Sequence, residues 1–548
     1  MGPANFCTTP KFGSSSGRMS KTRAVWFFIA ALTLIRLSML GSTDLEFDEA
    51  HYWMWSERLA PGYFSKGPGI AFAIRASTML FGPTEFGVRF WSPILAAGTS
   101  LLLFYLGKRL FNENVGLWSV IAFNVTPIFN VGAFVMTTDA LSIFSWTASM
   151  FTFWLAIEKS PRFSFYWPLT GLLIGLGFLS RFTNAFEVVC VLLVLALAPR
   201  LRQEFKRPGL YWLLGIFVVC TIPPIVWNAQ HAWVTTMHLR TRGGLAENIG
   251  FRPLEPLKFF GEHFVFYSPL LFGALVWAVI GGWRRVNQQF KILFLFWFGF
   301  PVFAFYFLLS LNHVATPNWD AVSFVSLGLL AVHFWNERIE KHGVRVFATT
   351  AVVLGFLLSF FSLDTDILRS AGILRLLKMI HLVRPDPSDR WRGWKSLAAE
   401  VERIRNEQEA KLGEKLFMIA DERHRASEIS FYLRDKRVEG PGHPPVYLVE
   451  SQDLINQFSF WPRYDQFVDA PARPGQSPDE TLTEQKGENP FMGRSALLIR
   501  NYGKNPPHNI RAAFESTEAV GTIELKRFGQ HVRYWQVFLC RGYRTLPL

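Results

Sequence analysis

Long apolar runs alternate with short polar connections through the first two thirds of the chain. Allowing for breaks at Pro and Gly, about eleven of these runs approach the roughly 20 mainly apolar residues that a membrane-spanning helix needs. They lie near residues 24–42, 90–107, 115–135, 139–157, 165–180, 184–199, 210–228, 263–283, 291–311, 319–335 and 344–363. The pattern predicts a mainly α fold, a polytopic transmembrane helical bundle with about 11 spans.

Lys and Arg residues gather in every second connection, near residues 11–23, 108–109, 159–162, 200–207, 284–291 and 338–345. By the positive-inside rule these connections are cytoplasmic. The other side then receives two long outer loops, near 43–89 and 229–262. The first run carries Arg36 and lacks a small-residue cleavage site. We therefore expect an uncleaved first span after a cytoplasmic tail, residues 1–22.

The last third of the chain, residues 364–548, differs in kind. It is charged and has short β-like runs near 415–420, 445–449, 496–500 and 532–540. The segment WKSLAAEVERIRNEQEAKL, residues 394–412, is typical of a helix. An odd number of spans within residues 23–363 carries this part to the outer side, so we expect an extracytoplasmic α/β domain.

Composition supports the membrane class. The chain of 548 residues is 50% hydrophobic and 18% charged, whereas globular proteins average about a quarter charged. Its net charge of +14 comes from clusters that flank apolar runs, so we expect no nucleic-acid partner. The four cysteines lie far apart without metal-ligand spacing, so we expect neither a disulfide framework nor a zinc site.

The polar segment EFDEAHYWMWSERLAPGYFSKGP, residues 46–68, follows the first apolar run. A helix starting near Asp48 would place five side chains on one stripe: Asp48, His51, Tyr52, Trp55 and Leu59. Such an aromatic helix suits the membrane surface. A structural explanation is equally open, in which Asp48 is only the N-cap of the helix and the rings belong to an interfacial belt.

Two further acids, Asp139 and Asp320, stand at the outer ends of predicted spans. Each could be a helix cap, but acids that converge on one face indicate a water-filled cleft. Cations occur on the same side: Lys66, Arg181, Arg240 and Arg242. Arg181 lies between two tightly spaced apolar runs, where a guanidinium favours an anion such as phosphate. Snorkelling of Lys66, and a solvated loop or lipid head-group contact for Arg240 and Arg242, are the alternatives.

Carboxylates and phosphate-seeking cations at one membrane face indicate group transfer from a lipid phosphate. Cations would stabilise the departing phosphate, and a carboxylate would place or deprotonate the acceptor. A transporter or flippase of lipid-linked sugars is the alternative, although it predicts polar residues throughout the membrane depth. A sensor with an outer receptor domain is a third, but it leaves the loop acids unexplained.

At these residues the chain resembles the bacterial glycosyltransferase family 39 proteins, which are related to protein O-mannosyltransferases and to the lipid A aminoarabinose transferase. The similar pieces are FDEAHYWMWSERLAPGYFSKGP, MTTDALSIFSWTASMF, GLLIGLGFLSRFTNAF, PPIVWNAQHAWV, TPNWDAVSF and, in the tail, NQFSFWPRYDQF. The resemblance implies a C-type membrane glycosyltransferase fold, a polyprenyl-phosphate sugar donor, and an envelope glycolipid, glycan or protein acceptor. It also implies the bacterial inner membrane, with the N-terminus cytoplasmic and the C-terminal domain periplasmic.

The resemblance assigns roles to particular residues. It implies three catalytic acids: Asp48, Glu49 and Asp139. It implies a substrate-binding set: Lys66, Arg181, His51, Tyr52, Tyr63, Arg240 and Arg242. The family commonly has an acid and a proline where this chain has Ser65 and Gly67. A glycine there is expected to loosen the turn. The scheme is an inverting transfer that requires no cofactor, although a divalent metal remains compatible with it.

Overall fold

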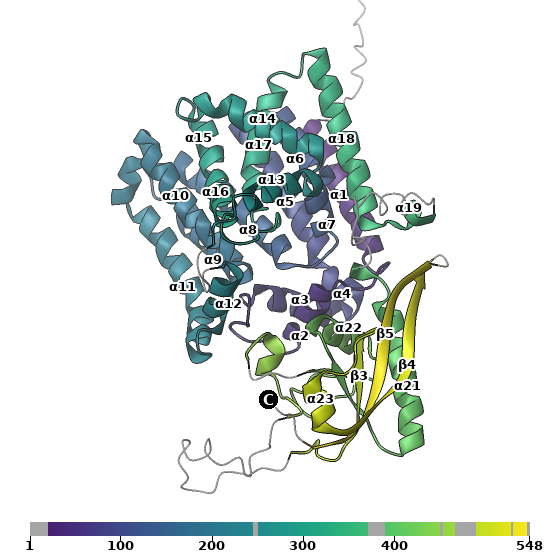
Figure 1. Ribbon diagram of the computed structural model, residues 1–548. Coiled ribbons are helices and arrows are strands. Elements are labelled where there is room, and N and C mark those ends of the chain that lie inside the picture. The colour runs from purple at the N-terminus through teal and green to yellow at the C-terminus, as the bar shows by residue number, and fades with distance from the viewer. Residues whose placement is uncertain are drawn as a thin grey trace, which may run out of the picture.

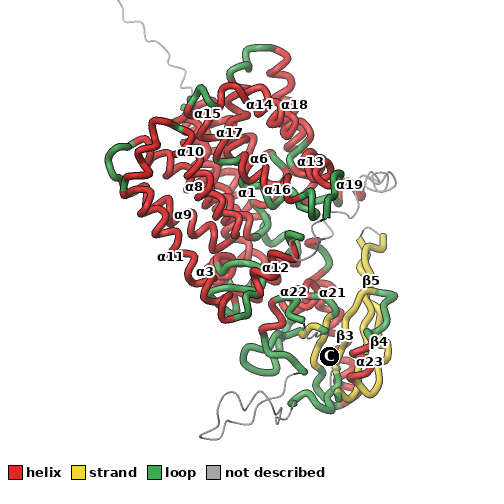
Figure 2. The backbone as a smooth tube through the Cα atoms, turned by 60° about the vertical axis from the view of Figure 1, so that its left-hand side comes forward, coloured by secondary structure: helices red, strands yellow, loops and turns green. Residues whose placement is uncertain are grey.

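A computed structural model describes residues 20–244, 250–370, 390–449, 453–465, 489–527 and 530–544. Residues 1–19 of the expected cytoplasmic tail lie outside this part. The chain forms a large helical part, and its C-terminal region forms a sheet with helices at one end of that bundle (Figure 1). Figure 2 shows the same arrangement from another side, with α22 next to the helical part.

Apolar sequence makes helices throughout the first part of the chain. Its elements are α1 (Lys21–Met39), α2 (Phe47–Ser56), α3 (Gly69–Phe81), α4 (Glu85–Arg89), α5 (Trp91–Leu110), α6 (Glu113–Val125), α7 (Pro127–Gly132), α8 (Thr138–Glu158), α9 (Tyr166–Ser180), η1 (Phe182–Ala185), α10 (Phe186–Leu197), η2 (Pro199–Lys206), α11 (Pro208–Gln230), α12 (Val234–Arg242), α13 (Glu255–Phe266), α14 (Pro269–Val286), α15 (Phe290–Trp297), α16 (Phe300–Leu309), α17 (Ser323–Asn336), α18 (His342–Leu363) and α19 (Asp366–Ser370).

Each predicted apolar run is largely helical, but several runs are broken. Among the described residues, six helical stretches are long and apolar enough to cross a membrane: Lys21–Met39, Glu85–Leu110, Thr138–Glu158, Pro208–Gln230, Phe290–Leu309 and His342–Leu363. A bent pair, Phe182–Leu197 with Pro199–Lys206, would make a seventh. Breaks precede Pro127 and Pro269, because proline starts a helix well but cannot continue the preceding one. The multi-span bundle is confirmed, while the count of eleven stays a prediction.

The C-terminal region combines a five-stranded mixed sheet with helices, as the sequence predicts. Its elements are α21 (Trp394–Leu412), β1 (Phe417–Ala420), α22 (Arg423–Tyr432), β2 (Tyr447–Leu448), η4 (Gln457–Phe460), β3 (Ala496–Asn501), α23 (His508–Ala513), β4 (Phe514–Arg527) and β5 (Gln530–Tyr543). The strand order is β2-β1-β3-β5-β4. Strand β1 pairs in parallel with β2 and β3, and β5 pairs antiparallel with β3 and β4.

The core of the C-terminal region continues into the helical part. Trp53 on α2 and Ile74 on α3 belong to one hydrophobic cluster with Val401, Ile429 and Leu497 of the C-terminal region. Burying such apolar surface is the main favourable term in the packing of two units. Helices α2 and α3 are therefore fixed between the membrane-spanning helices and the sheet, and the first outer loop becomes a structured platform. The predicted domain boundary at residue 364 stays a prediction.

Candidate active site

A cavity of about 650 Å³ opens where α2, α8, α9 and α12 approach the start of α22. Seven of the residues singled out in the sequence line it: Asp48, His51, Tyr52, Lys66, Asp139, Arg181 and Arg242. The predicted stripe on α2 faces this cavity through four of its members, because Trp55 lines it too. Leu59 lies beyond the end of α2 at Ser56 and is exposed.

Glu46, not Asp48, caps α2. The carboxylate of Glu46 accepts a hydrogen bond of 2.8 Å from the backbone N–H of Asp48, and the backbone N–H of Glu46 donates one of 2.8 Å to Glu49. This reciprocal pair is a capping box, here with a glutamate as the N-cap. The N-cap interpretation of Asp48 is wrong, and its side chain is free to face the cavity.

Glu49 does not face the cavity, contrary to the catalytic role that the resemblance implies. It is fully buried, and its carboxylate binds Nη2 of Arg89 at 2.7 Å and the backbone N–H of Met136 at 2.7 Å. Arg89 also donates to the carbonyls of Leu40 and Asp44. A buried ion pair needs such complete hydrogen bonding to offset its desolvation. Glu49 anchors α2 to the end of the first span and to the loop before α8.

The turn that carries Lys66 presses against the end of α9. A Cβ atom on Gly67 would lie 2.2 Å from the carbonyl oxygen of Leu179, so only glycine permits this approach. The departure from the family motif therefore tightens the contact between turn and helix, whereas the sequence suggested a looser turn. The backbone N–H of Tyr63 donates to the carbonyl of Lys66 over 3.2 Å. Lys66 is thereby held beside Arg181.

Tyr63 lies outside the cavity lining, unlike the other rings expected to bind substrate. Its hydroxyl donates to the carbonyls of Trp55 and Arg58, each over 3.1 Å. Its ring stacks on Trp55 with centroids 4.3 Å apart. Tyr63 therefore braces the end of α2, and its substrate-binding assignment is replaced by a structural one.

Asp139 and Arg181 form an ion pair at the cavity wall. Arg181 follows the last residue of α9, and Asp139 lies in the first turn of α8. The cap of α8 is Thr137, whose hydroxyl accepts from the backbone N–H of Asp139, so the capping explanation of Asp139 is wrong. Asp139 holds the guanidinium at the position where the spans meet the cavity.

Helix α12 contributes two side chains to the cavity, His238 and Arg242, which are four residues apart and share one face. The guanidinium of Arg242 lies 5.3 Å from the ring centroid of Trp319. Arg240 is exposed and lies outside the cavity lining, so its role in substrate binding stays a prediction.

Asp320 does not join the other two acids. It is fully buried, and its carboxylate lies 3.1 Å from Nε2 of His263 on α13. It therefore links the segment before α17 to α13 and is not itself part of the cavity lining, although its neighbours Trp319 and Ala321 are. The expected convergence of three acids is reduced to Asp48 and Asp139.

The C-terminal region supplies three basic side chains to the cavity that the sequence did not reveal: Arg390, Arg423 and His424. Nη2 of Arg423 lies 3.4 Å from Oδ1 of Asp48, and Nη1 of Arg390 lies 3.8 Å from Oε1 of Glu46. Basic residues cluster near residue 423 in the sequence. Nothing in the sequence, however, connects them with a loop hundreds of residues earlier.

Positive charge exceeds negative charge in the cavity. Among the described residues, its lining has five cations, Lys66, Arg181, Arg242, Arg390 and Arg423, and three acids, Glu46, Asp48 and Asp139. Burial, with Arg181 and Arg242 nearby, lowers the pKa of Lys66 to about 7. Burial together with the charges of Arg242 and Lys66 lowers the pKa of His238 to about 4. This excess of cations suits an anionic ligand.

The described residues contain no group of three or more His, Cys, Asp or Glu side chains arranged to hold a metal ion. The cavity offers a half-buried carboxylate, Asp48, beside a set of cations. A carboxylate can accept a proton, and the cations can stabilise a departing phosphate.

Comparisons with known proteins show what the chain is similar to. The family described as dolichyl-phosphate-mannose-protein mannosyltransferase matches residues 65–227. A protein of Rhizobium johnstonii named lipid A galacturonosyltransferase RgtD is 28% identical over 332 residues, which cover 60% of this chain and 68% of that protein. An undecaprenyl phosphate-alpha-4-amino-4-deoxy-L-arabinose arabinosyl transferase of Serratia proteamaculans is 23% identical over 323 residues, and the match spans only 55% of its length.

A solved structure extends the likeness to nearly the whole chain. The crystal structure of ArnT from Cupriavidus metallidurans bound to undecaprenyl phosphate superposes with a TM-score of 0.59 at 14% sequence identity. It covers 95% of this chain and 98% of that one. The resemblance to glycosyltransferase family 39 is therefore confirmed, and the chain has the fold of the ArnT structure.

Proposed function

We propose that the protein is an inverting glycosyltransferase that moves a hexosyl or pentosyl unit from a polyprenyl-phosphate-linked donor to an envelope acceptor. One observation carries the proposal, namely that Asp48 shares a single cavity with Lys66, Arg181 and Arg242. The names of the relatives, lipid A and undecaprenyl phosphate sugar transferases, support this donor class and a glycolipid acceptor.

In this reaction an acceptor hydroxyl attacks the anomeric carbon of the sugar while Asp48 accepts its proton. The bond between the anomeric carbon and the phosphate oxygen breaks, and the electron pair leaves with the polyprenyl phosphate. Lys66, Arg181 and Arg242 stabilise the charge that develops on this phosphate. General-base assistance of this kind contributes about 10²–10⁴-fold to the rate. Attack opposite the leaving group inverts the anomeric configuration.

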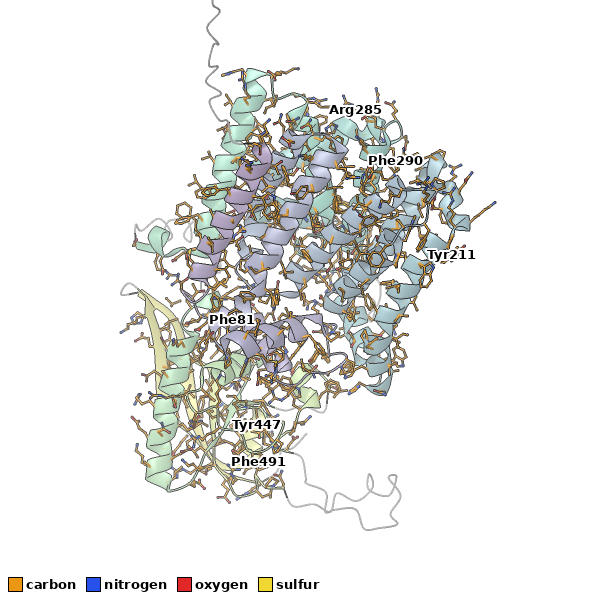
Figure 3. The ribbon with its side chains drawn as sticks, turned by 180° about the vertical axis from the view of Figure 1, so that it is seen from behind. Phe81, Tyr211, Arg285, Phe290, Tyr447 and Phe491 are labelled. Carbon is orange, nitrogen blue, oxygen red and sulfur yellow. The ribbon has the colours of Figure 1, made fainter. Side chains whose placement is uncertain are left out.

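We place the cavity on the periplasmic side of the bacterial inner membrane. Arg285, in one of the basic connections, lies at the end of the helical part farthest from Tyr447 and Phe491 of the C-terminal region (Figure 3). The positive-inside rule favours a cytoplasmic position for that end. The candidate residues gather at the opposite end only, which favours an enzyme over a flippase that must serve both faces.

The test is transfer of a radiolabelled sugar from polyprenyl phosphate to endogenous acceptors in membranes. We expect Asp48→Asn to lower kcat about 10²-fold or more, because the amide cannot accept the proton. We expect Arg181→Ala to raise the donor KM chiefly. Glu57→Gln is the matched control, since Glu57 follows α2 and pairs with exposed Arg75 outside the cavity. Full activity of a folded Asp48→Asn protein would refute the general-base role.

A further inference from the structure

We infer that Arg423 is a positioning residue of the active site, so that the C-terminal region forms part of the catalytic machinery. The inference rests on the proposed function, because it assigns Arg423 the task of orienting the carboxylate that accepts the proton. Arg423 comes from α22, about 370 residues after Asp48, and its Nη2 atom lies 3.4 Å from Oδ1 of that residue.

Helix α22 packs against α2. The Oγ atom of Ser427 lies 3.1 Å from Nδ1 of His51, and the rings of Phe431 and Trp53 are 5.0 Å apart. The backbone N–H of Leu45 donates to the hydroxyl of Tyr432 over 2.8 Å. These contacts are side chains of one α22 face and fix the two helices against each other.

This docking decides where the first residue of α22 lies. The ring of His424 packs on Phe47 with centroids 4.1 Å apart, so the first turn of α22 meets the first turn of α2. Arg423 and Asp48 are each 34% exposed, which leaves both accessible from the cavity. Arg423 is consequently held at the site by a rigid scaffold, unlike an arginine on a free surface.

The C-terminal region makes a second contact with the cavity wall. The side-chain amide oxygen of Gln457 accepts a hydrogen bond of 2.7 Å from the backbone N–H of Phe64, two residues before Lys66. The segments carrying Asp48 and Lys66 are thus both tied to the C-terminal region. The cavity would lose part of its wall without it, because Gln457, Arg390 and Arg423 all line it.

Asp48 has one acidic and one basic neighbour in the cavity, Glu46 and Arg423. Burial with the charge of Asp48 raises the pKa of Glu46 to about 8, so Glu46 is largely protonated near neutral pH. Arg423 is then the charged neighbour, with its Nη2 atom 3.4 Å from Oδ1 of Asp48. The ion pair uses Oδ1 of Asp48, so Oδ2 is not engaged by Arg423 and can receive the proton of the acceptor hydroxyl.

The experiment measures kcat and donor KM against pH in the full-length protein for Arg423→Gln and Arg423→Lys. We expect Arg423→Gln to lower kcat about 10-fold to 100-fold, as small misplacements of a catalytic group do, with little change in donor KM. Arg423→Lys should restore most of kcat. Arg403→Gln is the matched control, because Arg403 on α21 is exposed, lies outside the cavity lining and pairs with Glu400 and Glu407.

Two further measurements separate this inference from the proposed function. In an Asp48→Asn background, Arg423→Gln should cause no further loss of kcat, and full additivity would overturn the inference. Carbodiimide modification of Asp48, followed by mass spectrometry, needs no substrate and should be several-fold faster at pH 6 in Arg423→Gln. Unchanged modification would overturn the positioning role even if transfer occurs. If the modification of Asp48 is faster in Arg423→Gln as expected, but the wild type transfers no sugar, only the proposed function would be overturned.

Discussion

Lys66 shows how single residues set the charge of the cavity. Its ammonium group lies among Arg181 and Arg242, and the resulting repulsion adds to the cost of burial. An ammonium in this position is ionised only in part near neutral pH. A bound phosphate would favour the ionised form of Lys66, because it places a negative charge between the three cations.

Binding of a phosphodiester should therefore weaken as pH rises. The pKa of Lys66 in the empty cavity is about 7, and a bound anion raises it. The affinity for the phosphodiester should be highest below pH 7 and should fall as the pH rises above 7. Titration calorimetry with a short-chain prenyl phosphodiester between pH 6 and 8.5 measures this. A phosphodiester stays monoanionic over that range, so a change of affinity with pH reflects ionisation of the protein.

Lys66→Arg is the matched control for this titration. The guanidinium stays charged at every pH used, so binding should become nearly independent of pH. A slope as steep as that of the wild type would show that another group is responsible.

At the scale of elements, α2 owes its place to interactions on the side away from substrate. Its capping box and the Glu49–Arg89 ion pair fix the helix against the first span and the loop before α8. Asp48 and Glu49 are neighbours in sequence but point in directions about 100° apart on a helix. One residue consequently faces the cavity and the other faces the protein interior.

We expect Glu49→Gln to act on stability. The substitution leaves Arg89 buried without its counter-charge, which costs about 3–5 kcal/mol. Thermal unfolding in detergent should show a markedly lower Tm than for Asp48→Asn, whose residue lies at the cavity. A Glu49→Gln protein with wild-type stability and no transfer would restore the catalytic assignment of Glu49.

At the scale of the whole molecule, the reaction site lies between two units that share a hydrophobic cluster. The helical part supplies the acids and most of the phosphate-seeking cations, and the C-terminal region supplies Arg390 and Arg423. Arg285, in one of the basic connections, lies at the end of the helical part far from the C-terminal region (Figure 3). The proposed orientation thus separates the site from the cytoplasm by the full thickness of the membrane.

Labelling with an impermeant maleimide tests this orientation. In intact spheroplasts, a cysteine at position 502, where Tyr502 is exposed on the C-terminal region, should react from outside. A cysteine at position 285 should react only after the membrane is opened, because that connection is cytoplasmic by the positive-inside rule. Labelling of both positions from outside, or of position 285 alone, would contradict the orientation.

Much of this arrangement could be predicted from the sequence, because hydrophobic periodicity is local. The apolar runs, helix α21 and strands β1, β2, β3 and β5 follow from it. Strand β4 was missed because FESTEAVGTIELKR is mostly polar and its pairing with β5 decides its conformation. Arg423 was missed for a related reason, since only tertiary docking brings it to Asp48.

The ion pair between Asp139 and Arg181 also has a consequence for ligand choice. A tethered carboxylate acts at a high effective concentration, so small ions dissolved in the surroundings displace it poorly. An anion that displaces the Asp139 carboxylate therefore needs additional binding energy. A polyprenyl chain in the bilayer supplies about 0.8 kcal/mol for each buried methylene. Arg181 should therefore bind anions that carry a lipid chain, and free inorganic phosphate should be a poor inhibitor.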